Sequence, residues 1–312
     1  MTAQFEILHA GPHVSLQDGG RKGALRYGVP ASGPMDRLAL SAANRALGNP
    51  ADAVGVEVSL AGLTLKCSAG AVTLAVAGGG FVVEHAGRKY GSWQVLTVAQ
   101  GETLVIRPGG WGTWCCLAFA GDLQSPRWMN SAATHGSSGL GGGKLSTGGQ
   151  LTVQATRINA ALNGPIPCPV FARPRHQLRI SLGPQDRFFA PETLQDLLTS
   201  RFTLTSAYDR MGVRLSGPPL PPAAELSMPS EPIARGSIQV AGDGVATVLL
   251  ADHQTTGGYP KIATVLDCDL DGFAQLRPRD AVSFHAVTPD QAIRLARTQA
   301  HSVAAYLARL GS

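Results

Sequence analysis

The segment Val54–Gly79, VGVEVSLAGLTLKCSAGAVTLAVAGG, decides the fold class because it alternates apolar residues with small or polar ones between glycine turns. Alternation with a period of two is typical of β-strands, whose successive side chains point to opposite faces of a sheet. The same pattern continues to Val105 and returns in Trp114–Gly121. Short strands with turn signals about every 8–12 residues predict a β-sandwich or a β-barrel.

The composition fits a large β-rich core with few helices. The 312 residues are 44% hydrophobic and 15% charged, and they include 38 glycines and 21 prolines. These levels of glycine and proline favour short strands and tight turns over helical bundles. Helix signals, with spaced apolar residues and a cap or a stop, occur in Met35–Pro50, Ala190–Ser200 and Thr288–Ser312.

Low-complexity and proline-rich segments predict two domains. Ser125–Gln150 is rich in Ser, Gly and Thr, which is typical of a functional or mobile loop. Asn163–His176 is rich in proline and typical of a linker. Short similar segments in the two halves, such as Gln100–Ile106 and Pro278–Phe284, suggest that the halves are related barrels. We therefore expect domains at residues 1–165 and 166–312, the second with a terminal helix.

Charge and cysteine usage exclude several classes of protein. The net charge of +5 is mild and the arginines are scattered, so we expect no nucleic-acid partner but an acidic or phosphorylated small substrate, or an acidic protein partner. The five cysteines form no CxxC pair, which favours a reducing compartment. We see no signal-peptide pattern, no apolar run long enough for a membrane and no His spacing typical of a metal site. These features predict a cytoplasmic protein without membrane segment or metal.

The first chemical motif is QDGGRKGALRYGVPASGPMDR, Gln17–Arg37. Its glycines let the backbone approach a ligand and present N–H groups to an anion, although it is neither a P-loop nor a dinucleotide fingerprint. The candidates in it are Asp18, Arg21, Ser32 and Asp36. A site and a structural loop over the mouth of a barrel both remain open.

The second motif is VLLADHQTTGGYPKIATV, Val248–Val265, where polar residues interrupt two apolar runs. A tight hairpin needs only two turn residues, and buried polar groups without partners are costly. The motif is therefore either a solvated hairpin or the wall of a site. Its candidates are Asp252, Gln254, Thr255, Thr256, Tyr259 and Lys261.

Two further groups of polar residues have either a functional or a purely structural role. Gln185, Asp209 and Arg210 follow predicted strands, and an Asp-Arg pair is either a structural salt bridge or a fork for carboxylate or phosphate. His135–Lys144, HGSSGLGGGK, is superficially like the glycine-serine signature of amidases. A serine nucleophile needs a positioned base, so a flexible or partner-contacting loop is favoured there.

Several of these segments together resemble the allophanate hydrolase subunit 2 family, also called the biotin-dependent carboxyltransferase-like family. The resemblance covers about Phe5–Phe284. The segments that carry it are Gln17–Pro50, Leu182–Asp186, Ala207–Leu220, Gly236–Val240 and Leu249–Val265. The family implies tandem cyclophilin-like β-barrels, hence a mainly β fold with a few short helices. It includes the C subunit of bacterial ATP-dependent 5-oxoprolinase, which implies two partners, a B-like subunit and an A-like one.

The resemblance leads us to expect one component of a 5-oxoprolinase that is active only in complex. It would hydrolyse the lactam of 5-oxoproline (pyroglutamate) to glutamate with ATP, bound together with a partner protein. Asp252 or Asp18 would act as base or orient water, and Lys261 and Arg21 would hold carboxylate or phosphate. The remaining candidates would bind the substrate; they are Ser32, Asp36, Gln185, Asp209, Arg210, Gln254, Thr255, Thr256 and Tyr259.

Two alternatives remain open at this point. One is carboxyl transfer from carboxybiotin to a urea-like amide; the biotin would be carried by another protein, because this sequence has no Met-Lys-Met carrier motif. The other is a non-catalytic regulatory protein that binds its B-like partner, an inhibitor of a sensor kinase. One departure from the family pattern is Ala207, where relatives often have serine.

Overall fold

The computed structural model describes residues 1–223 and 228–311, and its contacts divide the chain into two compact units. The first unit comprises Met1–Lys22, Ala31–Arg173 and the residues from Val303 onward. The second comprises Gly23–Pro30 and Pro174–Ser302. The expected domain boundary at residue 165 lies shortly before this division, and two segments, residues 23–30 and those from Val303, group with the opposite half of the chain.

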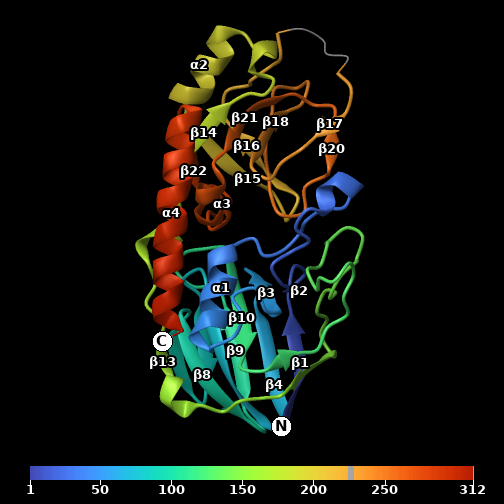
Figure 1. The fold of residues 1–312 in the computed structure, drawn as a ribbon, viewed down its shortest axis with the longest axis vertical. Coiled ribbons are helices and arrows are strands. Elements are labelled where there is room, and N and C mark those ends of the chain that lie inside the picture. Colours follow the sequence, from blue (N-terminus) through green and yellow to red (C-terminus); the bar gives the residue numbers. More distant parts are fainter. Residues whose placement is uncertain (224–227, 312) are drawn as a thin grey trace. The chain divides into compact units, whose positions relative to one another are not determined.

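The first unit is built from two antiparallel sheets that enclose one core (Figure 1). One sheet has the order β11-β12-β1-β4-β9-β6-β7 and the other β13-β8-β5-β10-β3-β2. The strands of the first sheet are β1 (Thr2–Ala10), β4 (Leu63–Ala69), β6 (Val82–His85), β7 (Arg88–Gly91), β9 (Thr103–Arg107), β11 (Asp122–Leu123) and β12 (Gln150–Gln154). Those of the second are β2 (Ser15–Gln17), β3 (Gly55–Ser59), β5 (Ala71–Ala77), β8 (Gln94–Ala99), β10 (Trp114–Phe119) and β13 (Gly164–Pro165).

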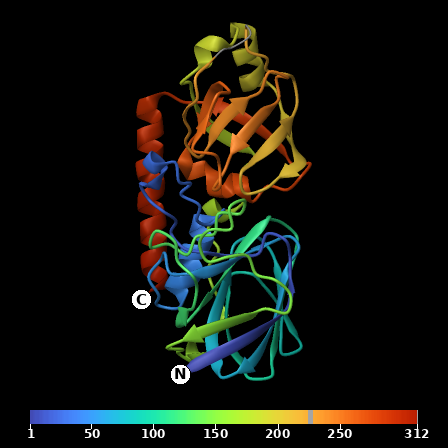
Figure 2. The ribbon, with the colours of Figure 1, turned by 90° about the vertical axis from the view of Figure 1, so that its right-hand side faces the viewer.

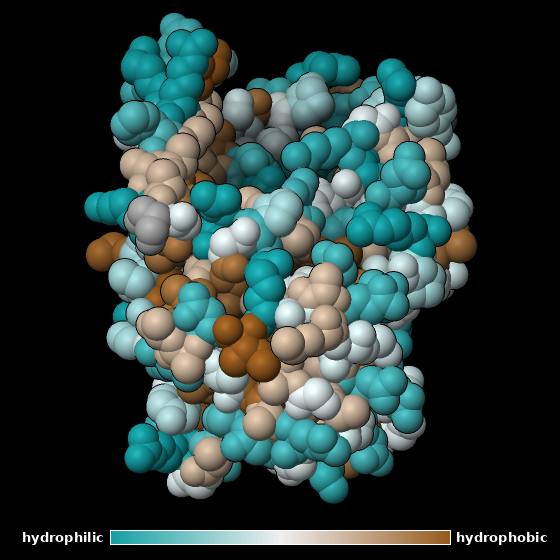
Figure 3. Space-filling view, turned by 60° about the horizontal axis from the view of Figure 1, so that its bottom comes forward, coloured by the Kyte–Doolittle hydropathy of each residue, from teal (hydrophilic) through white to brown (hydrophobic). Residues whose placement is uncertain are grey.

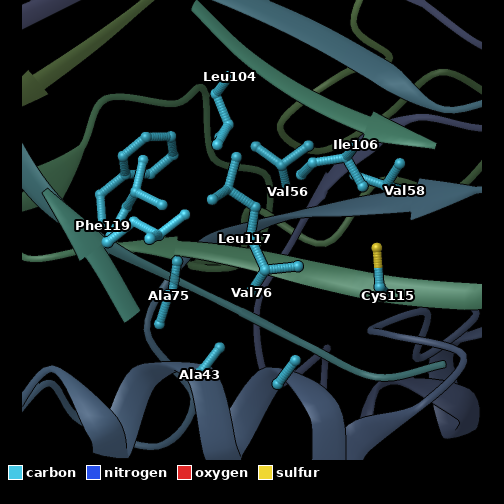
Figure 4. Close-up of a cluster of buried hydrophobic side chains, with 14 of the residues drawn as sticks. Ala43, Val56, Val58, Ala75, Val76, Leu104, Ile106, Cys115, Leu117 and Phe119 are labelled. Atoms are coloured by element: carbon cyan, nitrogen blue, oxygen red, sulfur yellow. The ribbon is translucent and has the colours of Figure 1, made fainter. Parts of the chain in front are cut away.

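Apolar side chains from both sheets fill the space between them. The rings of Phe5 on β1 and Phe119 on β10 lie 5.4 Å apart between centroids. Figure 4 shows Val56, Leu104 and Leu117 meeting in the same layer. In β1, β4 and β9 the alternation becomes the division between core and surface, because every second residue of a strand points inward. Strands β3 and β10 are instead buried along their whole length.

Helix α1 (Arg37–Ala46) packs on the sheet that contains β10 (Figure 4). Asp36 caps its N-terminus, and the carboxylate accepts a hydrogen bond of 2.9 Å from the N–H of Ala39. Gly78 lies opposite with φ of +94°, and a Cβ there would come within 2.7 Å of the Ala39 Cβ. The helix predicted at Met35–Pro50 is confirmed, and its small residues allow close packing on the sheet.

The second unit is a closed barrel of seven strands (Figure 2). The order is β14-β21-β18-β19-β16-β15-β22, and the parallel pair β14–β22 closes the ring with β15 on the other side of β22. The strands are β14 (Gln177–Leu182), β15 (Phe202–Tyr208), β16 (Gly212–Ser216), β18 (Ser237–Val240), β19 (Ala246–Leu249), β21 (Lys261–Val265) and β22 (Ala281–Ala286). A separate ribbon pairs β17 (Glu231–Pro232) with β20 (Thr256–Gly257).

Further α-helices and short 3-10 turns complete the described part of the fold. Helices α2 (Pro191–Thr199) and α4 (Pro289–Leu310) fall where the sequence predicts them, and Thr288 and Gln291 exchange hydrogen bonds at the start of α4. Helix α3 (Asp267–Ala274) was not predicted, because its acidic residues hide the apolar spacing. The 3-10 turns are η1 (Ala24–Tyr27), η2 (Ala160–Leu162), η3 (Val170–Ala172) and η4 (Asp186–Phe188).

The segment Val248–Val265 is not a hairpin. Strands β19 and β21 do not pair with each other, because β18 lies between them in the barrel. The chain between them must therefore cross the end of β18, and it pairs on the way with β17 through β20. A crossing of this length needs its own hydrogen-bonding groups, which explains the many polar residues.

The predicted mainly β fold with few helices is confirmed.

Apolar residues on the face drawn in Figure 3 lie in small groups between hydrophilic ones. No helix in the described part of the chain is both long and apolar enough to span a membrane.

Candidate functional site

Asp18 organises the glycine-rich loop of the first unit. One carboxylate oxygen accepts hydrogen bonds from the Gly20 N–H at 3.0 Å and the Ser131 hydroxyl at 2.6 Å. The other accepts from the Ala132 N–H at 2.7 Å. The buried carboxylate therefore joins β2 to a loop 113 residues further along the chain.

Arg21 makes the second connection between the same two segments. Its Nε donates to the Trp128 carbonyl at 3.2 Å, and an Nη donates to the Ala133 carbonyl. The guanidinium also lies 4.9 Å from the centre of the Trp128 ring. We call Asp18, Arg21 and the segment Trp128–Ala133 the Asp18 cluster. This part of the loop expected to be flexible is therefore fixed by buried polar contacts.

A cavity of about 540 Å³ opens beside the Asp18 cluster. Its wall combines Gly19 and Gly20 with charged groups of both signs; these are Asp18, Lys22, Asp52, Asp122 and Arg127. Arg127 lies 3.8 Å from the Asp18 carboxylate. A cavity of this size with mixed charges and exposed backbone can hold a small polar molecule.

Ser32 and Asp36, the other candidates of this motif, do not line that cavity. Ser32 is half-buried with φ of +53°. Asp36 is the helix cap described above, and it lies near Glu57, which is fully buried and accepts from the Met35 N–H at 2.5 Å. Burial, reinforced by the charges of Glu57 and Asp36, raises the pKa of the Cys115 thiol well above its usual value. Glu57 was missed, although a glutamate inside the apolar run VGVEVS is a visible signal.

In the second unit, Asp252 and Arg210 form a buried, two-pronged ion pair. The Arg210 Nε donates to one Asp252 oxygen at 3.0 Å and an Nη donates to the other at 2.9 Å. The neighbouring Asp209 is exposed and accepts from the N–H groups of Met211 and Gly212 within its turn. Because Arg210 engages both Asp252 oxygens, the geometry favours a structural role; the role of Asp252 as a base stays a prediction.

Lys261 lies in a second group of polar residues. Its backbone N–H donates to the Gln185 side-chain oxygen at 2.9 Å, and its buried ammonium lies 3.5 Å from a Glu231 oxygen. The Gln185 amide nitrogen donates to the same Glu231 oxygen. Gln254 donates to the Gln239 side chain at 2.8 Å. We call Gln185, Glu231, Gln239, Gln254 and Lys261 the Lys261 cluster.

The Lys261 cluster meets solvent through Glu231, whose side chain is 40% exposed. The cluster thus combines an ammonium, a carboxylate and three amide groups, which are donors and acceptors suited to a polar molecule. Glu231 and Gln239 were missed. Gln239 is a polar residue in the buried strand SIQV, which is a signal, whereas the position of Glu231 depends on the β17–β20 pairing.

The other candidates of Val248–Val265 differ in their contacts and in their exposure to solvent. The Thr255 carbonyl accepts from the Ile233 N–H, Thr256 is exposed on β20, and Tyr259 is 56% exposed. Burial lowers the pKa of His253, whose Nδ1 donates to the Gln254 carbonyl at 2.7 Å. This histidine is therefore neutral near pH 7.

The sequence prediction that the two polar motifs face one cleft stays a prediction. The Asp18 cluster belongs to the first unit, whereas the Lys261 cluster belongs to the second. Within residues 1–223 and 228–311, no group of three or more His, Cys, Asp or Glu side chains is placed to hold a metal ion.

The family model for the carboxyltransferase domain, subdomain A and B, matches residues 27–286, which include the Lys261 cluster and Asp36. The chain belongs to this carboxyltransferase family. The resemblance found in the sequence is thereby confirmed.

Relatives agree with the family over nearly the whole chain. A protein of Haemophilus influenzae, named as the C subunit of 5-oxoprolinase, is 33% identical over 94% of this chain and 94% of its own length. A protein of the same name from Escherichia coli is 28% identical over 95% of both chains. The Kluyveromyces lactis urea carboxylase structure matches 97% of this chain with a TM-score of 0.86 and 25% identity. The match covers 29% of that larger protein.

Proposed function

We propose that this carboxyltransferase-family chain is the C subunit of a heteromeric ATP-dependent 5-oxoprolinase, active with a B-like and an A-like protein of the same enzyme. The observation that carries the proposal is the end-to-end match with two relatives that bear this name. A match over 94% or more of both chains leaves no additional domain in those relatives to account for their name. The cysteine composition supports a cytoplasmic location.

The reaction needs recognition of a small anionic lactam. A lactam carbonyl is stabilised by resonance, so phosphorylation of its oxygen by ATP would make attack by water feasible. The Lys261 ammonium, which lies 3.5 Å from a Glu231 oxygen, would exchange this partner for the carboxylate of 5-oxoproline, since an ammonium in a water-poor site attracts an anion strongly. The amides of Gln185 and Gln254 offer donors and acceptors for the lactam N–H and carbonyl.

The proposal is tested by co-expressing the chain with its A-like and B-like partners. Release of glutamate from 5-oxoproline should require ATP and all three proteins. Lys261→Met should lower turnover, whereas Lys66→Met, a change of an exposed lysine on β4, should not. Absence of ATP-dependent glutamate release from the purified complex would contradict the proposal.

A second function, carboxyl transfer from carboxybiotin to a urea-like amide, is favoured by the family description and by the likeness to the urea carboxylase. It would require a biotin carrier on another protein. The two functions are separated by supplying the complex with a carboxylated biotin carrier, urea, 5-oxoproline and ATP: transfer of the carboxyl group from carboxybiotin to urea without glutamate formation would support the second.

A further inference from the structure

A second cavity of the first unit has features that neither candidate site uses. It measures about 620 Å³, within the range of small-molecule pockets. We call it the Trp111 cavity. Its wall is formed by the turn after β5, strand β7 with the residues that follow it, the end of β9, and the segment before the second unit; representative residues are Gly80, Tyr90, Trp93, Arg107, Trp111 and Arg173.

The backbone holds the Trp111 indole in place. The Gly80 N–H donates to the Trp111 carbonyl at 2.8 Å. A Cβ at Gly80 would lie 2.2 Å from the indole nitrogen, and one at Gly109 would lie 1.8 Å from the Gly80 carbonyl oxygen. The ring thus lies directly against glycine backbone. A ring fixed in this way loses little conformational freedom when a ligand binds to it.

Arg173 covers a face of the indole. Its exposed guanidinium lies over the Trp111 ring, 4.6 Å from the ring centre. An indole and a guanidinium plane are the groups on which nucleobases stack in proteins. Because the cation–π contact is solvent-exposed, it is weak, and Arg173 can turn toward a ligand without much loss.

The charges around the cavity favour an anion. Lys89 and Arg107 line it and share one carboxylate, Glu84, at 3.9 Å and 2.5 Å. Arg173 adds a third cation, and no Asp or Glu lies among the described residues of the wall. Three cations against one neighbouring carboxylate leave a positive excess, which attracts phosphate oxygens.

We propose that the Trp111 cavity binds a nucleoside phosphate, with its base inserted between the Trp111 ring and the Arg173 guanidinium, which turns outward, and its phosphates toward Lys89 and Arg107. All of these contacts come from this chain, so the inference does not need the 5-oxoprolinase activity. If that activity is correct, the cavity is a place for its ATP. The indole face has no groups that select one base, so we expect weak discrimination among bases.

Binding is tested by calorimetry of the full chain, without partner proteins, with ATP, adenosine and tripolyphosphate. We expect ATP to bind saturably and at least tenfold more tightly than either fragment. Trp111→Leu should weaken ATP binding about 5- to 150-fold, the usual effect of losing one stacking partner, and leave tripolyphosphate binding unchanged. Lys89→Met should weaken both ATP and tripolyphosphate.

Two controls are matched to these variants. Arg173→Gln should weaken ATP binding, whereas Arg187→Gln should not, although Arg187 lies over Phe188 in a similar exposed contact at 4.7 Å. Lys66→Met, on an exposed face of β4, is the control for Lys89→Met. Because the Arg173 side chain is exposed, its variant keeps the test valid even if Trp111→Leu does not fold.

Three results would overturn the inference: no saturable ATP binding, ATP binding that is unchanged in both Trp111→Leu and Arg173→Gln, or tripolyphosphate binding as tight as ATP. The first excludes a nucleotide, and the other two indicate a simple anion patch. If the chain binds ATP but the complex releases no glutamate, only the proposed activity is refuted. If the complex releases glutamate but this chain does not bind ATP, only this inference is refuted.

Discussion

The substitution Asp252→Asn is expected to destabilise the second unit rather than to act on chemistry alone. Asparagine keeps the shape of the side chain but leaves the buried Arg210 charge without its carboxylate. Breaking a buried ion pair by changing one partner costs about 3–5 kcal/mol. Since both oxygens of Asp252 accept from Arg210 within 3.0 Å, we expect the upper part of that range.

The free energy of unfolding is measured by urea denaturation, monitored by circular dichroism and extrapolated to water. Asp209→Asn is the matched control: this neighbouring aspartate is exposed, and its change should cost about 1 kcal/mol for weakened turn hydrogen bonds. The double variant Asp252→Asn/Arg210→Met should be less destabilised than the sum of the single changes, because it removes both members of the ion pair together.

One result would refute this reasoning. If Asp252→Asn unfolds within about 1 kcal/mol of the wild type while the reconstituted complex loses turnover more than a hundredfold, the ion pair is not what makes Asp252 important. Asp252 would then act in the reaction itself, as the sequence motif first indicated.

Three other predictions concern the loop, the cavity and the response to pH. Asp18→Ala removes the acceptor of three hydrogen bonds, so it should lower the free energy of unfolding by about 1.5–3 kcal/mol or more. It should also expose the Trp128–Ala133 segment to limited proteolysis, and an unchanged digestion pattern would contradict the role of Asp18 in fixing this loop. Gly80→Ala should lower stability by about 1–3 kcal/mol and shift the Trp111 indole NMR signal, because the added Cβ meets the ring. Gly91→Ala is the control, because a Cβ there meets no atom within 4 Å and its φ is not positive. His253 has a lowered pKa in the folded state, so the unfolded chain binds its proton more tightly, and stability should fall as the pH drops below about 6.5; the fall between pH 7 and 5 should be smaller in His253→Gln, and equal slopes for the two proteins would contradict this.

Much of the fold is visible in local patterns. The period of two in Val54–Gly79 predicted strands, and the spaced apolar residues of Met35–Pro50 predicted a helix, because both signals depend on residues only a few positions apart. The position of Asp36 at the helix start is visible for the same reason. Helix α3 was not predicted, because the acidic residues in its sequence weaken the apolar spacing.

The candidate sites were predicted only in part. Asp18, Arg21, Gln185 and Lys261 were named from the sequence and lie in buried polar clusters, but their partners were not foreseen. Asp18 meets Ser131 across 113 residues, and that contact depends on how the loops fold back on β2. The ion pair of Asp252 was not foreseen either, because its partner, Arg210, lies in a different turn.

The sequence by itself determined the mainly β class, the principal helices, the family and the polar character of both motifs, since these are properties of short stretches. Tertiary structure alone decided that β18 lies between β19 and β21, so that Val248–Val265 crosses the barrel end, and that Glu231 meets Lys261. It also decided that a glycine turn, Trp111 and Arg173 enclose one cavity. The physical reason is that strand order and register are set by the burial of the whole core, which no local pattern contains.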